Sequence, residues 1–223
     1  MKRGFWERYR QARKKQKPKL DGVPRDGWIS RLINRRISAL VTAGLAERNV
    51  RPNQVSCFVF LLGVLTCVPL FLMHHFFLAG IAVWIISILD GVDGELARLK
   101  KLGSPFGAFL DSFLDRLYDS SLIFAIALAM NSFSAWVFAF IGFFGMFLDY
   151  YTVELVGNKL GKGRMDKAQV KIVKKTKFWP ARDIFLFLIS IFSFLSIPHY
   201  GLFLAGMLSC IFSLARLGLA LKS

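Results

Sequence analysis

Long apolar runs are the feature that most constrains what this chain can fold into. Cys57–Met73 and Phe76–Leu89 contain no charged residue, and Ser120–Leu148 and Ile184–Ala215 lack Lys, Arg, Asp and Glu over more than one bilayer thickness. A transmembrane helix needs about 20 apolar residues. A soluble basic protein that binds nucleic acid would have periodic rather than continuous apolar sequence. We therefore predict an all-α, polytopic membrane protein that does not bind nucleic acid.

Three short polar turns divide the runs into six expected transmembrane helices. The turns are Met73–Phe76, Asn131–Ser134 and Ser196–Tyr200, and none contains Lys or Arg. The expected helices lie near 53–73, 76–98, 105–130, 133–156, 181–197 and 200–221. The connections on the opposite side are basic. By the positive-inside rule, the chain is predicted to cross the cell membrane several times with both termini in the cytoplasm.

The first 52 residues form a separate basic segment before the expected transmembrane domain, 53–223. Half of the 30 Lys and Arg residues lie there. Arg8–Lys19 is expected to be a solvated polybasic tail attracted to anionic lipid. In 26–45, apolar residues from Trp28 to Val41 recur at helical spacing, which predicts an amphipathic helix lying on the cytoplasmic leaflet.

Four aspartates interrupt this apolar pattern. Asp90 and Asp93 are three residues apart, and Asp111 and Asp115 are four apart, so each pair projects from one face of a helix. Antiparallel helices joined by the short loop Leu99–Ser104 would bring the two pairs to the same depth. Carboxylates in an apolar environment need compensating charge.

Divalent metal provides that compensation better than the nearest cations, Arg98 and Arg116. Carboxylate oxygens suit Mg²⁺ or Mn²⁺. Four of them on two helices can hold two ions about 3.5–4 Å apart, an arrangement suited to displacement at phosphorus. Gly94, Ala97 and Gly107 lie on the same helical stripes and leave room for a bulky ligand; close helix packing is the alternative explanation for these small residues.

The full pattern, Asp90-x2-Asp93-Gly94-x2-Ala97-Arg98-x8-Gly107-x3-Asp111-x3-Asp115, resembles the signature of the CDP-alcohol phosphotransferase family. The resemblance covers roughly residues 50–223. It implies a homodimeric membrane enzyme that displaces CMP from a CDP-alcohol and transfers the phospho-alcohol to an acceptor hydroxyl. It also implies metal binding by the four aspartates, with Asp115 as general base, at a site open to the cytoplasm. The residues that it places near CDP are Gly94, Ala97, Arg98, Ser104, Gly107, Asn53 and Gln54.

The acceptor is expected to bind near the basic connection Gly157–Asp183. Arg164, Lys167 and Arg182 are candidates for contacting a phosphorylated acceptor, although the positive-inside rule alone also explains these charges. Two segments, DGWISRLINRRIS…RPNQVS and PARDIFLFL, resemble the di-myo-inositol phosphate phosphate synthase branch of the family. That branch implies a polyol phosphate acceptor such as inositol phosphate. The donor stays open between CDP-diacylglycerol, CDP-archaeol and CDP-inositol, and the product between a phospholipid and an inositol phosphodiester.

Two other classes of protein also use helical aspartates. An isoprenoid-type transferase does not fit the Gly94, Ala97 and Arg98 pattern. A non-enzymatic divalent-cation-binding protein or transporter is the main alternative, but all four aspartates gather near one end of the expected helices. Three further acidic residues are expected to pair with cations or support the site: Asp119, Asp149 and Glu154.

Overall fold

The computed structural model describes residues 4–14, 21, 23, 27–178 and 182–222, and no β-strand is present in these ranges. The all-α prediction is confirmed for this part of the chain. The expected transmembrane segments correspond within a few residues to the following elements: α3 (Pro52–Leu72), α4 (Phe76–Leu89) with α5 (Gly91–Lys100), α6 (Pro105–Met130), α7 (Phe133–Tyr151), α10 (Arg182–Phe194) and α11 (Pro198–Leu221).

Four continuous helical stretches are long and apolar enough to cross a bilayer: Pro52–Leu72, Phe76–Lys100, Phe133–Lys159 and Pro198–Leu221. The other two predicted spans do not meet that standard in the described residues. α6 is 26 residues long but carries several charged side chains, and α10 has only 13 residues. Membrane-type helices are thus present, and the predicted number of six spans stays a prediction.

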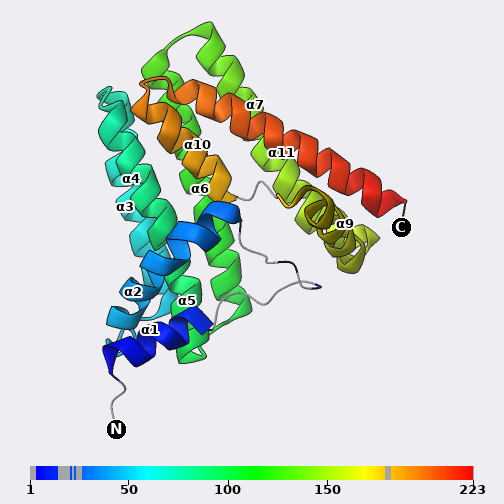
Figure 1. Ribbon diagram of the computed structural model, residues 1–223. Helices are drawn as coiled ribbons and strands as arrows, with labels where there is room; N and C mark the ends of the chain where they lie inside the picture. The colour runs from blue at the N-terminus through cyan, green and yellow to red at the C-terminus, as the bar shows by residue number, and fades with distance from the viewer. Residues whose placement is uncertain (1–3, 15–20, 22, 24–26, 179–181, 223) are drawn as a thin grey trace.

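The long helices pack in pairs, with α3 beside α6, α4 beside α10 and α7 beside α11 (Figure 1). Their shared core contains Leu122, Ile126, Ile189 and Leu202, each at most 1% exposed. The outer surface is apolar as well, since Leu65 and Phe140 are about 70% exposed. Large apolar side chains inside and outside fit a bundle surrounded by lipid.

Small residues allow α7 and α11 to approach closely. A Cβ atom at Gly206 would lie 2.4 Å from the Ile141 carbonyl oxygen, and one at Gly145 would lie 2.4 Å from the Gly206 carbonyl oxygen. Contacts of this kind are typical of helix pairs in membranes.

The N-terminal segment is more structured than the sequence predicted. Residues Phe5–Lys14 form helix α1, where a solvated tail was expected, and Ala12 of α1 is fully buried. Arg8 Nε donates a hydrogen bond of 3.0 Å to the Ala43 carbonyl, which fixes α1 on the following helix. Residues 15–19 of the predicted tail fall outside the described residues.

The expected amphipathic helix comprises a π-helical turn, η1 (Ser30–Asn34), and α2 (Arg35–Leu45). α1, α2 and α5 gather at one end of the bundle (Figure 1). Apolar side chains of the segment, such as Trp28, Leu32 and Leu40, are exposed. Its buried side contains small apolar residues, Ala39 and Ala43, and also a polar stripe, which we define as Asn34, Arg35, Ser38 and Thr42.

The basic connection before α10 is largely helical. It contains η2 (Thr152–Val156), α8 (Gly157–Leu160) and α9 (Lys162–Thr176). Met165 and Ala168 of α9 pack against Ala220 of α11. The lysines of α9 therefore lie on a helix that is anchored to the C-terminal part of the bundle.

Candidate active site

The four aspartates of the signature converge where the α4–α5 junction meets α6. We call Asp90, Asp93, Asp111 and Asp115 the aspartate cluster. Carboxylate oxygens of Asp90, Asp111 and Asp115 all lie within 4.8 Å of one another. Three carboxylates at this separation fit a hard divalent cation, which takes oxygen ligands from several side chains.

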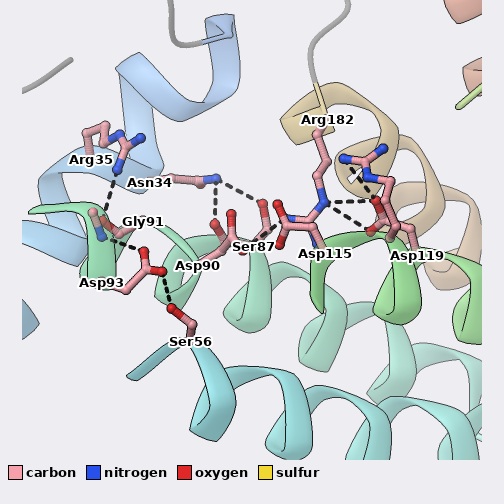
Figure 2. A network of polar contacts seen from close by, with 12 residues as sticks. Asn34, Arg35, Ser56, Ser87, Asp90, Gly91, Asp93, Asp115, Asp119 and Arg182 are labelled. Atoms are coloured by element: carbon pink, nitrogen blue, oxygen red, sulfur yellow. Dashed lines mark hydrogen bonds and ion pairs between the residues drawn. The ribbon is translucent and has the colours of Figure 1, made fainter. Parts of the chain in front are cut away.

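Asp93 is oriented by a neighbouring helix. It is 7% exposed and accepts a hydrogen bond from the hydroxyl of Ser56 on α3 (Figure 2). The other carboxylate oxygen lies 2.5 Å from the backbone nitrogen of Gly94, and Asp93 lines the same cavity as Asp90, Asp111 and Asp115. Asp93 therefore joins the cluster on the α3 side.

Arg182, at the start of α10, is bound to three carboxylates at once. Its Nη1 lies 2.9 Å from oxygens of both Asp90 and Asp115. Its Nε donates to the two oxygens of Asp119 at 3.0 and 2.9 Å (Figure 2). Asp119 is fully buried, and Arg116 Nη2 is 3.7 Å from it. Arg182 thus compensates much of the negative charge of the site.

This role of Arg182 was not predicted from the sequence, which pointed to Arg98 and Arg116 as the nearby cations. Arg182 is 63 residues away from Asp119 in the chain. It reaches the carboxylates only because α10 packs against α4, a long-range contact that no local spacing encodes.

A cavity of about 220 Å³ opens beside the aspartate cluster. Arginines line it together with the four aspartates, so both signs of charge face one space. The cationic residues on its wall are Arg35, Arg98, Arg116 and Arg182. A cavity with carboxylates for metal and guanidinium groups for anions is suited to a ligand that carries phosphate groups.

The predicted CDP-binding residues divide into two groups. Gly94 and Arg98 line the cavity, and a Cβ atom at Gly94 would lie 3.3 Å from Arg98 Nη1. Asn53, Ser104 and Gly107 gather where α3 and α6 begin, since a Cβ atom at Gly107 would lie 2.9 Å from Asn53 Oδ1.

Two of these residues also cap helices. Ser104 accepts a hydrogen bond of 3.0 Å from the Gly107 nitrogen, and Gln54 accepts one of 2.9 Å from the Arg51 nitrogen. Ala97 lies on α5, with its side chain partly exposed, and is not among the residues that line the cavity.

The predicted acceptor-binding residues are not brought together. Arg182 lies in the site, whereas Arg164 and Lys167 are exposed on α9 and do not line the cavity of the aspartate cluster. Lys167 lines a different surface cavity with Lys171 and Lys174.

Sequence reasoning missed several polar residues around the site. Ser56 belongs to an expected transmembrane segment, Asn34 to the expected interfacial helix and Asp183 to the end of the basic connection, and none was singled out. Asn34 and Asp183 nevertheless line the cavity, and Ser56 donates a hydrogen bond to Asp93. The expectation that Asp119 and Asp149 pair with cations is met, because Asp149 lies 2.9 Å from Arg216.

An acidic cluster and several arginines at one end of a bundle of apolar helices define a membrane-type protein with a candidate metal and phosphate site. The sequence model of the CDP-alcohol phosphatidyltransferase family matches residues 49–215, and the chain belongs to this family.

Named relatives include two kinds of synthase. The chain is 34% identical over 174 residues to the bifunctional IPC transferase and DIPP synthase of Aquifex aeolicus, covering 76% of this chain and 38% of that protein. It is 32% identical over 176 residues to the archaetidylinositol phosphate synthase of Pyrococcus horikoshii, covering 77% and 84%. The chain thus spans well under half of the length of the bifunctional relatives that it matches.

The fold also matches solved structures. Phosphatidylinositol phosphate synthase of Mycobacterium tuberculosis, in complex with manganese and citrate, superposes with a TM-score of 0.64 at 19% identity, covering 83% of this chain and 90% of that one. A structure of the same protein with CDP-DAG bound gives 0.63 at 20% identity, covering 84% and 95%. These likenesses establish a common fold.

Proposed function

We propose that this protein is a divalent-metal-dependent transferase that moves a phospho-alcohol group from a CDP-alcohol to an acceptor hydroxyl and releases CMP. The observation that carries the proposal is the convergence of Asp90, Asp111 and Asp115 within 4.8 Å, beside a cavity lined by arginines, in a chain of this family.

The aspartate cluster would hold Mg²⁺ or Mn²⁺, and we propose two ions. The relative crystallised with manganese supports the choice of a divalent metal. Bound metal would neutralise the pyrophosphate and stabilise the charge that develops on its oxygens. Gly94 leaves space against the cavity wall, and Arg98 supplies a guanidinium for the CDP phosphates. Ala97, Ser104, Gly107, Asn53 and Gln54 complete the proposed CDP-binding set.

Asp115 is the proposed general base. The acceptor hydroxyl oxygen attacks the phosphorus that bears the donor alcohol. The bond from this phosphorus to the oxygen of the CMP phosphate breaks, and the hydroxyl proton passes to the Asp115 carboxylate. Arg182, held by Asp119, lies beside this carboxylate and is placed to contact an anionic acceptor. Arg164 and Lys167 remain weaker acceptor candidates on α9.

The names of the relatives favour an inositol phosphate acceptor. One is called archaetidylinositol phosphate synthase and another phosphatidylinositol phosphate synthase. The fold relative binds CDP-DAG. We therefore propose a polyol phosphate acceptor. The proposed donor is one of three CDP-alcohols, CDP-diacylglycerol, CDP-archaeol or CDP-inositol, and the assay below distinguishes them.

The proposed topology is a six-span homodimer in the cell membrane, with both termini and the site on the cytoplasmic side. Its N-terminal segment, 1–52, would carry the interfacial helix, and 53–223 the transferase domain. Four apolar helices of spanning length and the exposed apolar side of α2 support this arrangement.

The test is a CMP-release assay on purified protein in lipid nanodiscs. Each of the three donors is combined with inositol, inositol phosphate or glycerol phosphate, with and without Mg²⁺. We expect metal-dependent CMP release with one donor and a phosphorylated acceptor. Absence of CMP release with every pair, while Mn²⁺ still binds, would favour the non-enzymatic cation-binding alternative.

Within the same assay, Asp115→Asn is expected to lower the rate of CMP release about 10²–10⁴-fold, because the hydroxyl proton loses its acceptor. Glu47→Gln, on the exposed surface where Glu47 pairs with Arg8 of α1, is the control and should keep the wild-type rate. An unchanged rate in Asp115→Asn would contradict the general-base assignment.

A further inference from the structure

A buried carboxylate that the proposed chemistry does not use lies beside the signature aspartates. Glu95 is 1% exposed and follows Asp93 by two residues on α5. It does not line the cavity of the aspartate cluster, although Asp93 and Gly94 do. A buried carboxylate is costly unless it is paired and hydrogen-bonded. Its partners should therefore reveal what it does.

Within the described residues, the hydrogen-bond and ion-pair partners of Glu95 are all side chains of α2 that belong to the polar stripe. Its Oε1 accepts a hydrogen bond of 2.8 Å from Ser38 and lies 3.3 Å from Arg35 Nη1. Its Oε2 accepts one of 2.9 Å from Thr42. Side chains of one helix thus bind both carboxylate oxygens. We call Glu95, Arg35, Ser38 and Thr42 the buried clamp.

The polar stripe also contacts two residues that precede Glu95 in the chain, Ser87 at the end of α4 and Gly91 at the start of α5. Arg35 Nη1 donates to the Gly91 carbonyl at 3.1 Å, and Asn34 Nδ2 donates to Ser87 Oγ at 3.1 Å (Figure 2). Ser87, Gly91 and Glu95 are spaced by four residues and so form one stripe. Gly91 has no side chain, which lets the guanidinium approach the backbone: a Cβ atom there would lie 2.2 Å from Arg35 Nη1.

These anchors lie on both sides of Asp90, whose backbone keeps helical dihedral angles (φ −51°, ψ −32°). α4 ends at Leu89 and α5 begins at Gly91, so Asp90 occupies the junction between two helices. One anchor precedes the junction and two follow it. Contacts with the polar stripe on both sides of Asp90 therefore fix where this helical stretch presents Asp90 and Asp93.

We propose that Glu95 is a positioning residue: through the buried clamp, α2 fixes the helix junction that presents Asp90 and Asp93 to metal. The inference rests on the proposed metal role of the aspartate cluster. Packing alone would not need the buried clamp. Apolar residues of similar volume often replace a buried ion pair without loss of stability. The clamp instead fixes one arrangement of two helices.

The test measures binding of Mn²⁺ alone to the purified full chain, by electron paramagnetic resonance of free Mn²⁺, together with the midpoint of thermal unfolding. In Glu95→Gln and Thr42→Val, we expect the Mn²⁺ dissociation constant to rise about tenfold, as for other residues that support metal ligands. Thr42→Ser keeps the hydroxyl and should keep the wild-type constant.

Ser190→Ala is the matched control for stability. Ser190 is fully buried and donates to the Gly80 carbonyl at 2.7 Å, joining α10 to α4 away from the clamp. The Ser190→Ala variant should have a lower unfolding midpoint and an unchanged Mn²⁺ dissociation constant. If Thr42→Val lowers the midpoint equally and also leaves Mn²⁺ affinity unchanged, the clamp is only packing and the inference is wrong. Absence of Mn²⁺ binding in the wild type would instead overturn both the metal site and the inference.

Discussion

At the scale of single residues, Arg182 joins two parts of the site that have different tasks. Its Nη1 contacts the carboxylates of Asp90 and Asp115, and its Nε is held by Asp119. Asp119 is fully buried, so its charge has little access to solvent. The direction of the guanidinium thus depends on Asp119, although Asp119 itself is outside the signature.

Replacement of Asp119 by Asn should separate binding from chemistry. We expect Asp119→Asn to raise KM for a phosphorylated acceptor about tenfold, with a smaller change in KM for the donor, because Arg182 loses a charge-assisted partner. The free energy of unfolding should fall by about 3 kcal/mol, as for a broken buried ion pair.

Asp149→Asn offers a matched comparison. It breaks the pair with buried Arg216, which does not line the cavity of the aspartate cluster. A smaller loss of stability, because the Asp149 side chain is 37% exposed, is expected with unchanged KM, measured by denaturant unfolding and steady-state kinetics. If both variants raise the acceptor KM equally, Asp119 does not act through Arg182.

The sequence predicted the aspartates better than their surroundings, for a physical reason. Asp90, Asp93, Asp111 and Asp115 lie on helices joined by a short loop, so helical periodicity alone brings them together. Arg182 and the partners of Glu95 arrive from distant helices. Their placement depends on which helix faces pack, and spacing within one segment carries no information on that.

At the scale of elements, the contact between α7 and α11 should tolerate no added side-chain atom. Gly206→Ala places a methyl group 2.4 Å from the Ile141 carbonyl oxygen. The helices must separate, and we expect a loss of about 1–3 kcal/mol. Gly218→Ala on the same helix has nothing within 4 Å and is the control. Thermal unfolding in nanodiscs should show a lower midpoint for Gly206→Ala alone; equal midpoints would contradict the close approach.

The orientation of α2 leads to a prediction for neighbouring residues. Ile37 and Arg36 are both exposed and are separated by about 100° around the helix. A spin label at Ile37→Cys should be relaxed mainly by lipid-soluble oxygen, and one at Arg36→Cys mainly by a water-soluble nickel chelate, because an interfacial helix presents different sides to lipid and water. Equal accessibility to both reagents would show that α2 does not lie on the leaflet.

Helix bounds were predictable where apolar runs were long, and not where charge was dense. α3 and α11 begin and end within two residues of the expected positions. α1 and α9 were interpreted as a tail and a connection because their basic residues hide the few apolar positions that pack, such as Ala12 and Met165. In such short helices the buried side is too small to produce a clear periodic pattern.

At the scale of the whole molecule, the predicted orientation can be tested by labelling from outside. In a variant without Cys57, Cys67 and Cys210, we introduce Ser134→Cys at the exposed start of α7 or Lys101→Cys in the exposed turn after α5. A membrane-impermeant maleimide should label intact cells only at position 134, because the positive-inside rule predicts that the basic turn faces the cytoplasm. Both sites should react after lysis. Labelling at position 101 in intact cells would reverse the proposed orientation.

The polar stripe of α2 has a consequence for biogenesis. Its contacts with Glu95 join residues 53 to 60 positions apart, and the stripe is synthesised first. While a nascent chain ends before Glu95, Ser38 and Thr42 cannot form the bonds seen in the folded protein. Docking of α2 on Glu95 must therefore follow synthesis of α5, so α2 is made before α5 but reaches its final position after it.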